Sequence, residues 1–278
     1  MGTSGASKQQ AAMVTGGSSG IGAAVCVALA RTGMQVAVLG RDEGRVAATV
    51  AECRAASPQG GDRVLGLSGI DVRDEQCVSS AVQDTLGRFG RIDILVNSAA
   101  IGRSGVSPGL LPAPVANLSA AAWDEVIATN LTGTFLVNRA VLPTMIQQGS
   151  GAIVNISSAP ALAAPRPYAA AYGASKFAIV GLSEALAAEV RRQGIRVHVL
   201  FPDAVDTPLI RGTTLGMHGT LPPARVADFV VALLSMPEDV VLVHPIIAPF
   251  GIPQRPSGAE ANGSGGDTRM PAPAGERG

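Results

Sequence analysis

Short apolar, β-branched runs alternate with longer stretches of helical periodicity from residue 11 to about residue 247. Runs of four to eight such residues are typical of strands, whereas apolar residues three or four positions apart over longer stretches indicate helices. The expected strands are Ala12–Thr15, Gln35–Leu39, Val64–Leu67, Ile94–Asn97, Ala152–Ser157, Arg196–Phe201 and Val240–His244. The expected helices are Gly22–Arg31, Glu43–Ala56, Glu75–Phe89, Ala120–Gln147, Tyr172–Gln193 and Ala224–Ser235.

This alternation predicts an α/β fold: a single doubly wound domain with a mostly parallel, seven-stranded sheet and helices on both faces. Ligands of such folds bind beyond the carboxyl ends of the strands, where chain direction across the sheet reverses. We expect this domain to cover residues 11–250, after a polar segment over residues 1–10. Residues 251–278 are rich in Gly, Pro, Ser and Ala, and we expect a disordered tail because they carry too little apolar surface to bury.

Charge and cysteine content narrow the classes of partner. The 21 acidic residues balance the 21 basic ones, which argues against nucleic acid or an anionic membrane as the main partner. Cys26, Cys53 and Cys77 form no C-x-x-C pair, so neither a disulfide framework nor a zinc site is expected. No apolar run is long enough to span a bilayer, and the N-terminus lacks an apolar signal core. The sequence therefore predicts a cytoplasmic protein without a metal site.

A glycine-rich segment directly follows the first expected strand and opens the first expected helix. Residues 14–22 read V-T-G-G-S-S-G-I-G. Gly16 permits the tight turn, while Gly20 and Gly22 let backbone amides and the helix approach a pyrophosphate closely. The helix N-terminus adds unpaired N–H groups and a partial positive charge, so the segment indicates a dinucleotide-binding loop rather than an ordinary strand–helix turn. The binding residues expected here are Gly16, Ser18, Ser19, Gly20, Ile21 and Gly22.

A tyrosine and a lysine four residues apart form the candidate proton-transfer pair. Tyr172 and Lys176 share one face of the expected helix because i and i+4 side chains are neighbours. A free tyrosine titrates near about 10 and a lysine near about 10.4. A neighbouring ammonium and a positive nicotinamide stabilise the phenolate, which lowers the pKa of the tyrosine toward the working range. The only other tyrosine, Tyr168, has no lysine at the matching offset.

These motifs, in this order, resemble the short-chain dehydrogenase/reductase family, whose glycine motif is T-G-x-x-x-G-I-G. The resemblance covers residues 11 to about 247. It implies that Tyr172 is the general acid or base and that Lys176 also holds the nicotinamide ribose. It further implies that Ser158 binds the substrate oxygen and that Asn130 bends the fourth helix and holds a relay water. Ser158 precedes Tyr172 by one position more than is usual in the family, so Ser157 stays an alternative.

The same resemblance supplies the remaining cofactor contacts. Asp71 and Val72 resemble the family's adenine-contacting pair, and residues 97–100, N-S-A-A, resemble its N-N-A-G. Residues 202–207, P-D-A-V-D-T, resemble the P-G-x-V-x-T segment that contacts the nicotinamide carboxamide. The cofactor-binding residues added in this way are Asp71, Val72, Asn97, Ala99, Tyr172, Lys176, Pro202, Val205 and Thr207.

The end of the second expected strand predicts the choice of dinucleotide. Gly40 stands where members of the family that prefer NAD carry Asp, and Arg41 follows it. A carboxylate would repel a 2′-phosphate, whereas a guanidinium binds it with two hydrogen bonds. NADP(H) is therefore the expected cofactor, with NAD(H) still open because a small backbone shift would bring Asp42 to the ribose.

Several segments depart from the family pattern. Asp203 stands where the family has Gly; if that position requires a positive φ, Asp tolerates it better than most residues but adds a charge near the cofactor. Only a dozen residues separate Pro208 from the helix expected near Pro222, which predicts a short lid and an open pocket, with Gly102–Leu118 as the opposite wall. Pro245 and Pro249 in the last strand region suit a sheet edge.

The resemblance implies an oxidoreductase that moves hydride between NADP(H) and a carbonyl or alcohol carbon of a small molecule. We expect a homodimer or homotetramer built on the long helices Ala120–Gln147 and Tyr172–Gln193. The alternative is a regulatory protein that binds NADP(H) with little or no turnover. A methyltransferase with a similar nucleotide loop would not carry the Tyr-x-x-x-Lys pair.

Overall fold

In the computed structural model of this chain, the structure describes residues 9–102, 114–162, 169–210, 219–237 and 239–249. The predicted tail over 251–278 lies outside the described residues, as do most of the predicted N-terminal segment, most of the Gly102–Leu118 wall and most of the short lid. The extent proposed for the domain, residues 11–250, therefore stays a prediction at its C-terminal end.

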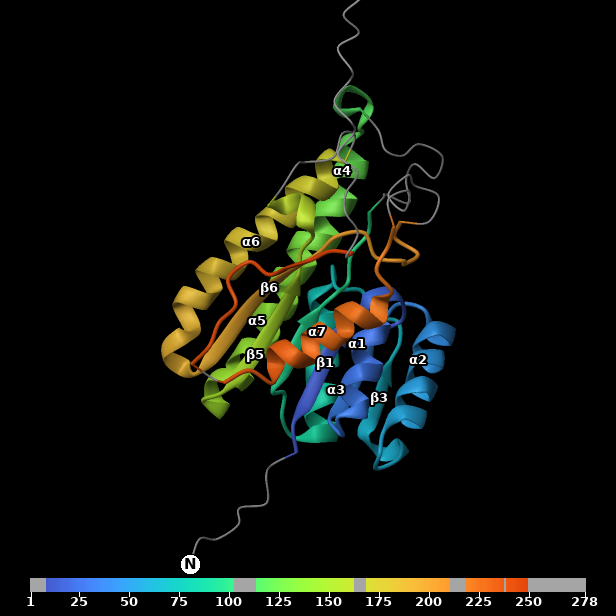
Figure 1. The fold of residues 1–278 in the computed structure, drawn as a ribbon, viewed down its shortest axis with the longest axis vertical. Helices are drawn as coiled ribbons and strands as arrows, with labels where there is room; N and C mark the ends of the chain where they lie inside the picture. The colour runs from blue at the N-terminus through green and yellow to red at the C-terminus, as the bar shows by residue number, and fades with distance from the viewer. Residues whose placement is uncertain (1–8, 103–113, 163–168, 211–218, 238, 250–278) are drawn as a thin grey trace, which may run out of the picture.

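Seven strands form one all-parallel sheet in the order β3-β2-β1-β4-β5-β6-β7 (Figure 1). The strands are β1 (Ala11–Thr15), β2 (Gln35–Leu39), β3 (Val64–Leu67), β4 (Ile94–Asn97), β5 (Gly151–Ile156), β6 (Ile195–Pro202) and β7 (Ile246–Ile247). The strand order reverses between β1 and β4, whose register pairs Thr15 with Asn97 at the carboxyl edge. This is the doubly wound α/β fold that the alternation predicts, and the reversal defines where a ligand binds.

Helices cover both faces of the sheet (Figure 1). They are α1 (Gly20–Arg31), α2 (Glu43–Ala56), α3 (Glu75–Phe89), α4 (Ala120–Ile127), α5 (Gly133–Gln148), α6 (Ala170–Val190) and α7 (Pro223–Leu234). One apolar core lies between the sheet and α1, α2 and α7, and a second lies between the sheet and α3, α5 and α6. The described helices include none that is long and apolar enough to cross a membrane.

Local side-chain chemistry explains where two of these helices begin. The carboxylate of Asp42 accepts a hydrogen bond from the backbone N–H of Arg45, and this caps the first turn of α2. Asp74 caps α3 in the same way, by accepting from the N–H groups of Gln76 and Cys77. Both helices begin and end where the sequence pattern predicts.

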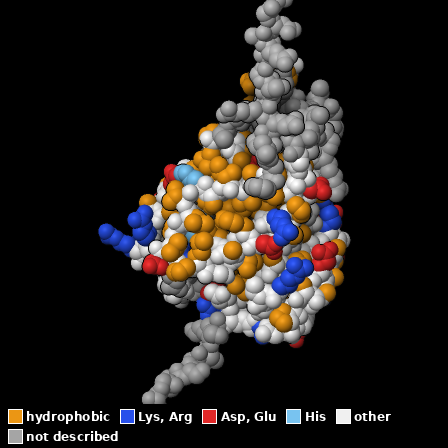
Figure 2. Space-filling view, viewed as in Figure 1, with side chains coloured by type: hydrophobic (Ala, Val, Ile, Leu, Met, Phe, Trp, Pro, Cys, Tyr) orange, Lys and Arg blue, Asp and Glu red, His pale blue; other side chains and the backbone are white. Residues whose placement is uncertain are grey.

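The prediction for the seventh strand is wrong in position. Residues 240–244 are not a strand; the pairing with β6 occurs at Ile246 and Ile247. His244 adopts a left-handed backbone with φ 50°, and the hydrogen bonds to β6 begin only at the Pro245 carbonyl, which accepts from the Phe201 N–H. Val243 in this run is 79% exposed, and Figure 2 shows apolar side chains at the surface of the face viewed in Figure 1. The β-branched run that predicted a strand thus lies on the surface, while β7 does take the edge position that its prolines favour.

The long helix predicted over Ala120–Gln147 is interrupted. A π-helical segment over Ala128–Thr132 separates α4 from α5 and contains Asn130. Single π turns inside helices are common at functional sites, because the wider turn re-aims the side chains in it. The expected disturbance at Asn130 is therefore present, in the form of a π turn.

Candidate functional site

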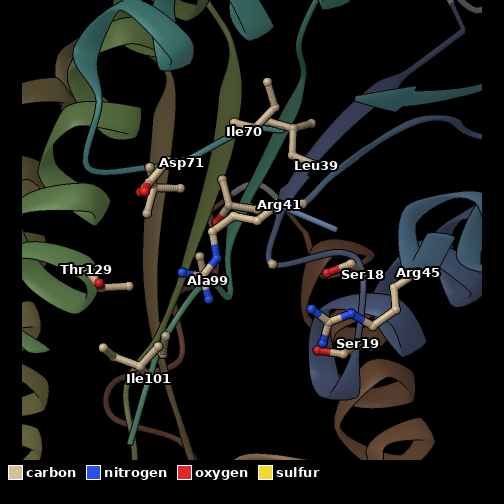
Figure 3. Close-up of a pocket in the computed structure, with 15 residues that line it drawn as sticks. Ser18, Ser19, Leu39, Arg41, Arg45, Ile70, Asp71, Ala99, Ile101 and Thr129 are labelled. Carbon is tan, nitrogen blue, oxygen red and sulfur yellow. Dashed lines mark hydrogen bonds between the residues drawn. The ribbon is translucent and has the colours of Figure 1, made fainter. Parts of the chain in front are cut away.

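A cleft opens at the carboxyl edge of the sheet, at the reversal between β1 and β4 (Figure 3). Backbone from the glycine-rich segment forms one side, and the segments after β2, β3 and β4 form the others. Its lining residues are Thr15, Gly16, Ser18, Ser19, Leu39, Gly40, Arg41, Arg45, Ile70, Asp71, Val72, Ala99, Ala100, Ile101 and Thr129. The cleft therefore lies where fold topology places the ligand of a doubly wound sheet.

The glycines of residues 14–22 are required by backbone geometry. Gly16 has φ 65°, and a β-carbon there would lie 2.7 Å from the backbone nitrogen of Ala99. A β-carbon on Gly22 would collide with the Gly16 carbonyl. Ser19, at the N-cap of α1, makes no side-chain capping bond, so the first-turn N–H groups of that helix are not capped by its hydroxyl. This arrangement suits a phosphate group bound at the N-terminus of α1.

Two arginines reach over the cleft, Arg41 from the segment after β2 and Arg45 from α2 (Figure 3). Sequence reasoning identified Arg41 but missed Arg45, whose position in the first turn of a helix that starts beside the cleft was the available signal. The Arg45 guanidinium lies 3.5 Å from the Asp42 carboxylate. The hydrogen bond from the backbone N–H of Arg45 is the main cause that holds the pKa of Asp42 below its usual value. Asp42 is thus engaged by α2 instead of pointing freely toward a ribose.

Gly40 packs tightly against the glycine-rich segment. A β-carbon at Gly40 would lie 2.7 Å from the β-carbon of Ser18 and 2.9 Å from a methyl of Val46. Real β-carbons essentially never approach this closely, so any side chain at position 40 requires rearrangement of its neighbours. Position 40, which would carry the ribose-binding carboxylate, therefore has no room for one in this chain.

Asp71 and Val72 line the cleft on the β3 side, as the resemblance implies. Arg73 holds the Asp71 carboxylate through its Nε at 3.0 Å and its Nη2 at 2.5 Å. These hydrogen bonds lower the pKa of Asp71, and their effect is larger than that of burial, which acts in the opposite direction. Val72 packs against Gly133, where an added β-carbon would lie 2.6 Å from a Val72 methyl. Glycine at position 133 therefore leaves the room that Val72 occupies.

A buried network of amides and hydroxyls joins β4 and β5 to α5 and α6. Asn97 Nδ2 donates to Asn138 Oδ1 at 2.7 Å and to Asn155 Oδ1 at 2.8 Å. Asn155 Nδ2 donates to Ser183 Oγ on α6 at 2.8 Å. The Thr15 hydroxyl accepts from the backbone N–H of residues 98 and 99, beside Asn97. Asn97 is therefore placed beneath the cleft and ties the strands together, and its side chain does not line the cleft.

Tyr172 and Lys176 come together on α6. The Lys176 ammonium lies 5.6 Å from the centre of the Tyr172 ring and donates to the carbonyl of Ile156 at 2.8 Å. Burial lowers the pKa of Lys176 to about 8, because the charged form loses its hydration. The Ser157 hydroxyl donates to the Lys176 carbonyl at 2.8 Å. Ser157 thus anchors α6 to the end of β5, a role that sequence reasoning missed.

Ser158 has a weaker attachment than its neighbour. Its hydroxyl donates to the Pro202 carbonyl at 3.4 Å, a long hydrogen bond. Because Ser157 is bound to α6, Ser158 is the better candidate for contact with a substrate oxygen. Pro202 thereby lies next to Ser158, at the end of β6.

The segment after β6 returns toward the glycine-rich segment. Val205 forms a bridge with Leu221, and a β-carbon on Gly20 would lie 3.0 Å from the Thr207 methyl. Asp203 does not have a positive φ, because His244 is the only non-glycine residue with one among those the structure describes. The Asp203 N–H instead donates to the Ile247 carbonyl at 2.8 Å, in a sheet-like contact.

Asn130 is completely buried and bound on several sides. Its Oδ1 accepts from the N–H of Ile101 at 2.8 Å, and its Nδ2 donates to the Ile101 carbonyl and to Ser175 Oγ, each at 3.0 Å. Both amide hydrogens are therefore used within the protein, and a relay water would have to bind another atom. Ser175, buried between Asn130 and Tyr172, was missed by sequence reasoning.

Of the histidines, the structure describes His198 and His244, which lie outside this constellation, whereas His218 is not among the described residues. His198 is buried in β6 with no hydrogen-bond partner on either ring nitrogen, and burial, followed by the charge of Arg196, lowers its pKa to about 4. His244 Nε2 lies 2.8 Å from Glu184 Oε1. Within the described ranges no group of three or more His, Cys, Asp or Glu side chains is arranged to hold a metal ion.

An all-parallel sheet of this order, with a glycine-rich loop at its reversal point, defines a Rossmann-type fold. The family model described as short chain dehydrogenase matches residues 10–216. The chain belongs to the short-chain dehydrogenase/reductase family of oxidoreductases, which confirms the resemblance carried by its motifs.

Three known proteins illustrate the likeness. D-threitol dehydrogenase of Mycolicibacterium smegmatis is 43% identical over 199 residues, which are 71% of this chain and 71% of that protein. An actinorhodin polyketide ketoreductase variant solved with NADPH is 30% identical, with a TM-score of 0.74 over 86% of this chain and 95% of its own. The 3-ketoacyl-(acyl-carrier-protein) reductase of Brucella melitensis, solved with NADH, is 29% identical, with a TM-score of 0.75 over 86% of this chain and 96% of its own.

Proposed function

We propose that this protein is an NADP(H)-dependent ketone reductase or secondary-alcohol dehydrogenase in which Tyr172 is the general acid and base. One observation carries the proposal: a buried lysine ammonium lies 5.6 Å from the ring of Tyr172 on α6. A phenol transfers its proton at neutral pH only when its anion is stabilised, and an adjacent ammonium provides that stabilisation. The family, shown independently, performs oxidoreductase chemistry.

The chain's own residues would divide the work as follows. Tyr172 donates its proton to the carbonyl oxygen during reduction and accepts it back from the alcohol during oxidation. Ser158 holds that same oxygen, and Lys176 stabilises the phenolate and binds the ribose hydroxyls beside it. Asn130 fixes the surrounding backbone. The nicotinamide, when bound, supplies or receives the hydride. Val205 and Thr207 are the proposed contacts for its carboxamide, and Ala99 for the adjoining part of the cofactor.

Three features of the cleft support a preference for NADP(H). Arg41 and Arg45 bring two guanidinium groups to the region where a ribose phosphate would lie. Position 40 has no room for a carboxylate, and Asp42 is engaged by Arg45 and the start of α2. The two guanidinium groups therefore attract a dianionic 2′-phosphate, whereas the 2′-hydroxyl of NAD has no carboxylate partner in this cleft.

The test is NADPH oxidation against a panel of ketones, quinones and acyl thioesters, with Tyr172→Phe as the variant. Removing a general acid costs about 10²–10⁴ in rate, so we expect the variant to lose most turnover. Its NADPH affinity should stay within about twofold, because the ring and the cleft are retained. Tyr168→Phe is the matched control, since it makes the same chemical change at the only other tyrosine and should keep turnover.

Two outcomes contradict the proposal. Equal turnover in Tyr172→Phe and in the parent protein would remove Tyr172 from proton transfer. Tight NADPH binding with no turnover on any member of the panel would favour the regulatory alternative, a protein that binds the cofactor without using it.

We further propose that the partners are a small carbonyl or alcohol substrate and a second copy of the chain. Exposed apolar side chains support self-association: Phe135 and Ile146 on α5, Phe177 on α6, and Ile246 in the edge strand β7. The three described cysteines are free, which supports placement in the reducing cytoplasm. Sedimentation of the wild-type chain distinguishes a monomer from a dimer or tetramer.

A further inference from the structure

A continuous chain of hydrogen bonds joins the loop after β4 to the backbone of Tyr172. The side chain of Asn130 forms hydrogen bonds with both the N–H and the carbonyl of Ile101. The same amide donates to Ser175 Oγ at 3.0 Å, and the Ser175 hydroxyl donates to the Tyr172 carbonyl at 2.7 Å. Asn130 and Ser175 are both fully buried, so the bond between them does not compete with solvent, while the bonds to Ile101 and Tyr172 are partly buried.

No side chain at the N-cap position caps the first turn of α6. Ala169, at its N-cap position, offers no side chain to cap the N–H groups of the turn. Gly173 follows Tyr172 directly, and glycine in a helix costs about 0.5–1 kcal/mol relative to alanine because it loses more backbone freedom. Tyr172 therefore sits in an uncapped helical turn, next to a flexible residue, at the point where its hydroxyl must be aimed most accurately.

We propose that Ser175 is a positioning residue: its hydroxyl fixes the turn that carries Tyr172 by linking it, through Asn130, to the loop after β4. The π turn over Ala128–Thr132 is what presents the Asn130 amide to both partners. Ser175 touches neither the reacting atoms nor the cofactor in this assignment. It acts by holding the Tyr172 backbone against the Ile101 segment, which lines the cleft.

The same helix contains a matched control. Ser183 is also buried, accepts a hydrogen bond from an asparagine amide (Asn155) and donates to a carbonyl of its own helix (Ile179) at 2.6 Å. It lies eleven residues beyond Tyr172, about 16 Å along the helix axis at the usual rise. Ser175→Ala and Ser183→Ala thus delete the same group in the same kind of environment, near Tyr172 and far from it.

The experiment compares the two variants in turnover and in the ionisation of Tyr172. The turnover arm rests on the proposed function, whereas the ionisation arm does not. Displacements of about 1 Å at a reacting group cost about 10² in rate, so we expect about a tenfold lower kcat in Ser175→Ala and a change within about twofold in Ser183→Ala. Both variants should lose similar thermal stability, because each leaves an asparagine amide with one bond fewer.

The ionisation arm uses the Tyr168→Phe background, in which Tyr172 is the only tyrosine. Phenolate absorbance is followed against pH with NADP⁺ bound. We expect a higher midpoint in Ser175→Ala than in Ser183→Ala, because a loosened turn holds the phenol less firmly near Lys176. Equal midpoints, or equal losses of kcat in the two variants, would overturn the assignment. A wild-type chain with no turnover but a Ser175-dependent midpoint would sink the proposed function and leave the assignment standing.

Discussion

The two ends of the candidate site consist of different kinds of residue. The end beside β1, β2 and β3 lines the cleft with backbone and with half-exposed or exposed charged side chains, among them Arg41, Arg45 and Asp71. The end beside β5 and α6 consists of buried polar groups that bind one another, such as Asn130, Ser175 and Lys176. The side chains of the first end lie at the surface of the protein, whereas those of the second end are part of its core.

This difference separates recognition from chemistry in physical terms. Removing an exposed cation changes which ligand binds, with little cost to folding, because water replaces the lost contact. Removing a buried polar group leaves its partners unsatisfied and alters both stability and geometry. Substitutions at the two ends should therefore be distinguishable by whether affinity, turnover or unfolding responds.

The largest effect is expected for Lys176→Met. Loss of the ammonium beside Tyr172 should lower kcat by about 10²–10⁴-fold, the range for general acid–base catalysis. Stability should move the other way. The folded chain loses the Lys176 proton from a pKa of about 8, while the unfolded chain keeps it to its ordinary value near 10.5, so burying the charge destabilises the protein most below about pH 8.

Thermal unfolding of the cofactor-free proteins checks this sign. Lys176→Met should be more stable than the parent below about pH 8, and the gap should narrow as the pH rises toward 10.5. A variant that is less stable at every pH would mean that the bond to the Ile156 carbonyl outweighs the cost of burial.

A smaller effect, confined to cofactor choice, is expected at the other end of the site. Arg41→Ala should lower the preference for NADPH over NADH by about 30-fold, since a hydrogen bond to a charged group contributes about 1.5–3 kcal/mol. Arg45→Ala should lower it several-fold, because its side chain is 57% exposed and shares its charge with Asp42. The measurement is kcat/KM for both dinucleotides, with unfolding temperature as the control. A large stability loss in either variant would break the contrast drawn between the two ends.

The smallest effect concerns a buried group outside the site. His198 has a pKa of about 4 when folded and an ordinary value of 6.5 when unfolded, so the unfolded chain binds more protons between these values. Stability should fall by about 1–2 kcal/mol as the pH drops from 8 to about 5.5. His198→Leu should remove this loss without changing turnover at pH 8, which denaturant titrations at the two pH values measure. An unchanged acid sensitivity in the variant would assign it to other groups.

Much of the fold follows from local patterns in the sequence. Apolar runs located six strands within about one residue, and the helical periodicity gave the bounds of α2 and α3. The seventh strand failed because the run at 240–243 is apolar yet exposed, and hydrogen bonding to β6 begins only after Pro245. Strand formation at an edge depends on which backbone groups of the neighbouring strand are available, and composition does not reveal this.

The candidate site divides in the same way. Residues within a contiguous motif, such as Gly16, Tyr172 and Lys176, were predictable because the motif sets their local geometry. Ser157 and Ser175 were not, because their importance lies in contacts with Lys176 and Asn130 that form only when β5, α6 and the π turn are assembled. Single-chain patterns report neighbours along the chain, whereas these contacts join residues 19 and 45 positions apart.

The crowding around Gly40 constrains how this protein can be redesigned. A single replacement of Gly40 by aspartate, the direct route to a ribose-binding carboxylate, would drive the new side chain into Ser18 and Val46. Overpacking of this kind costs about 1–3 kcal/mol. The order of changes therefore matters: trimming Ser18 and Val46 first would make the aspartate tolerable, while the reverse order passes through an unstable intermediate. A laboratory lineage selected for the other dinucleotide would be expected to alter those two neighbours before position 40.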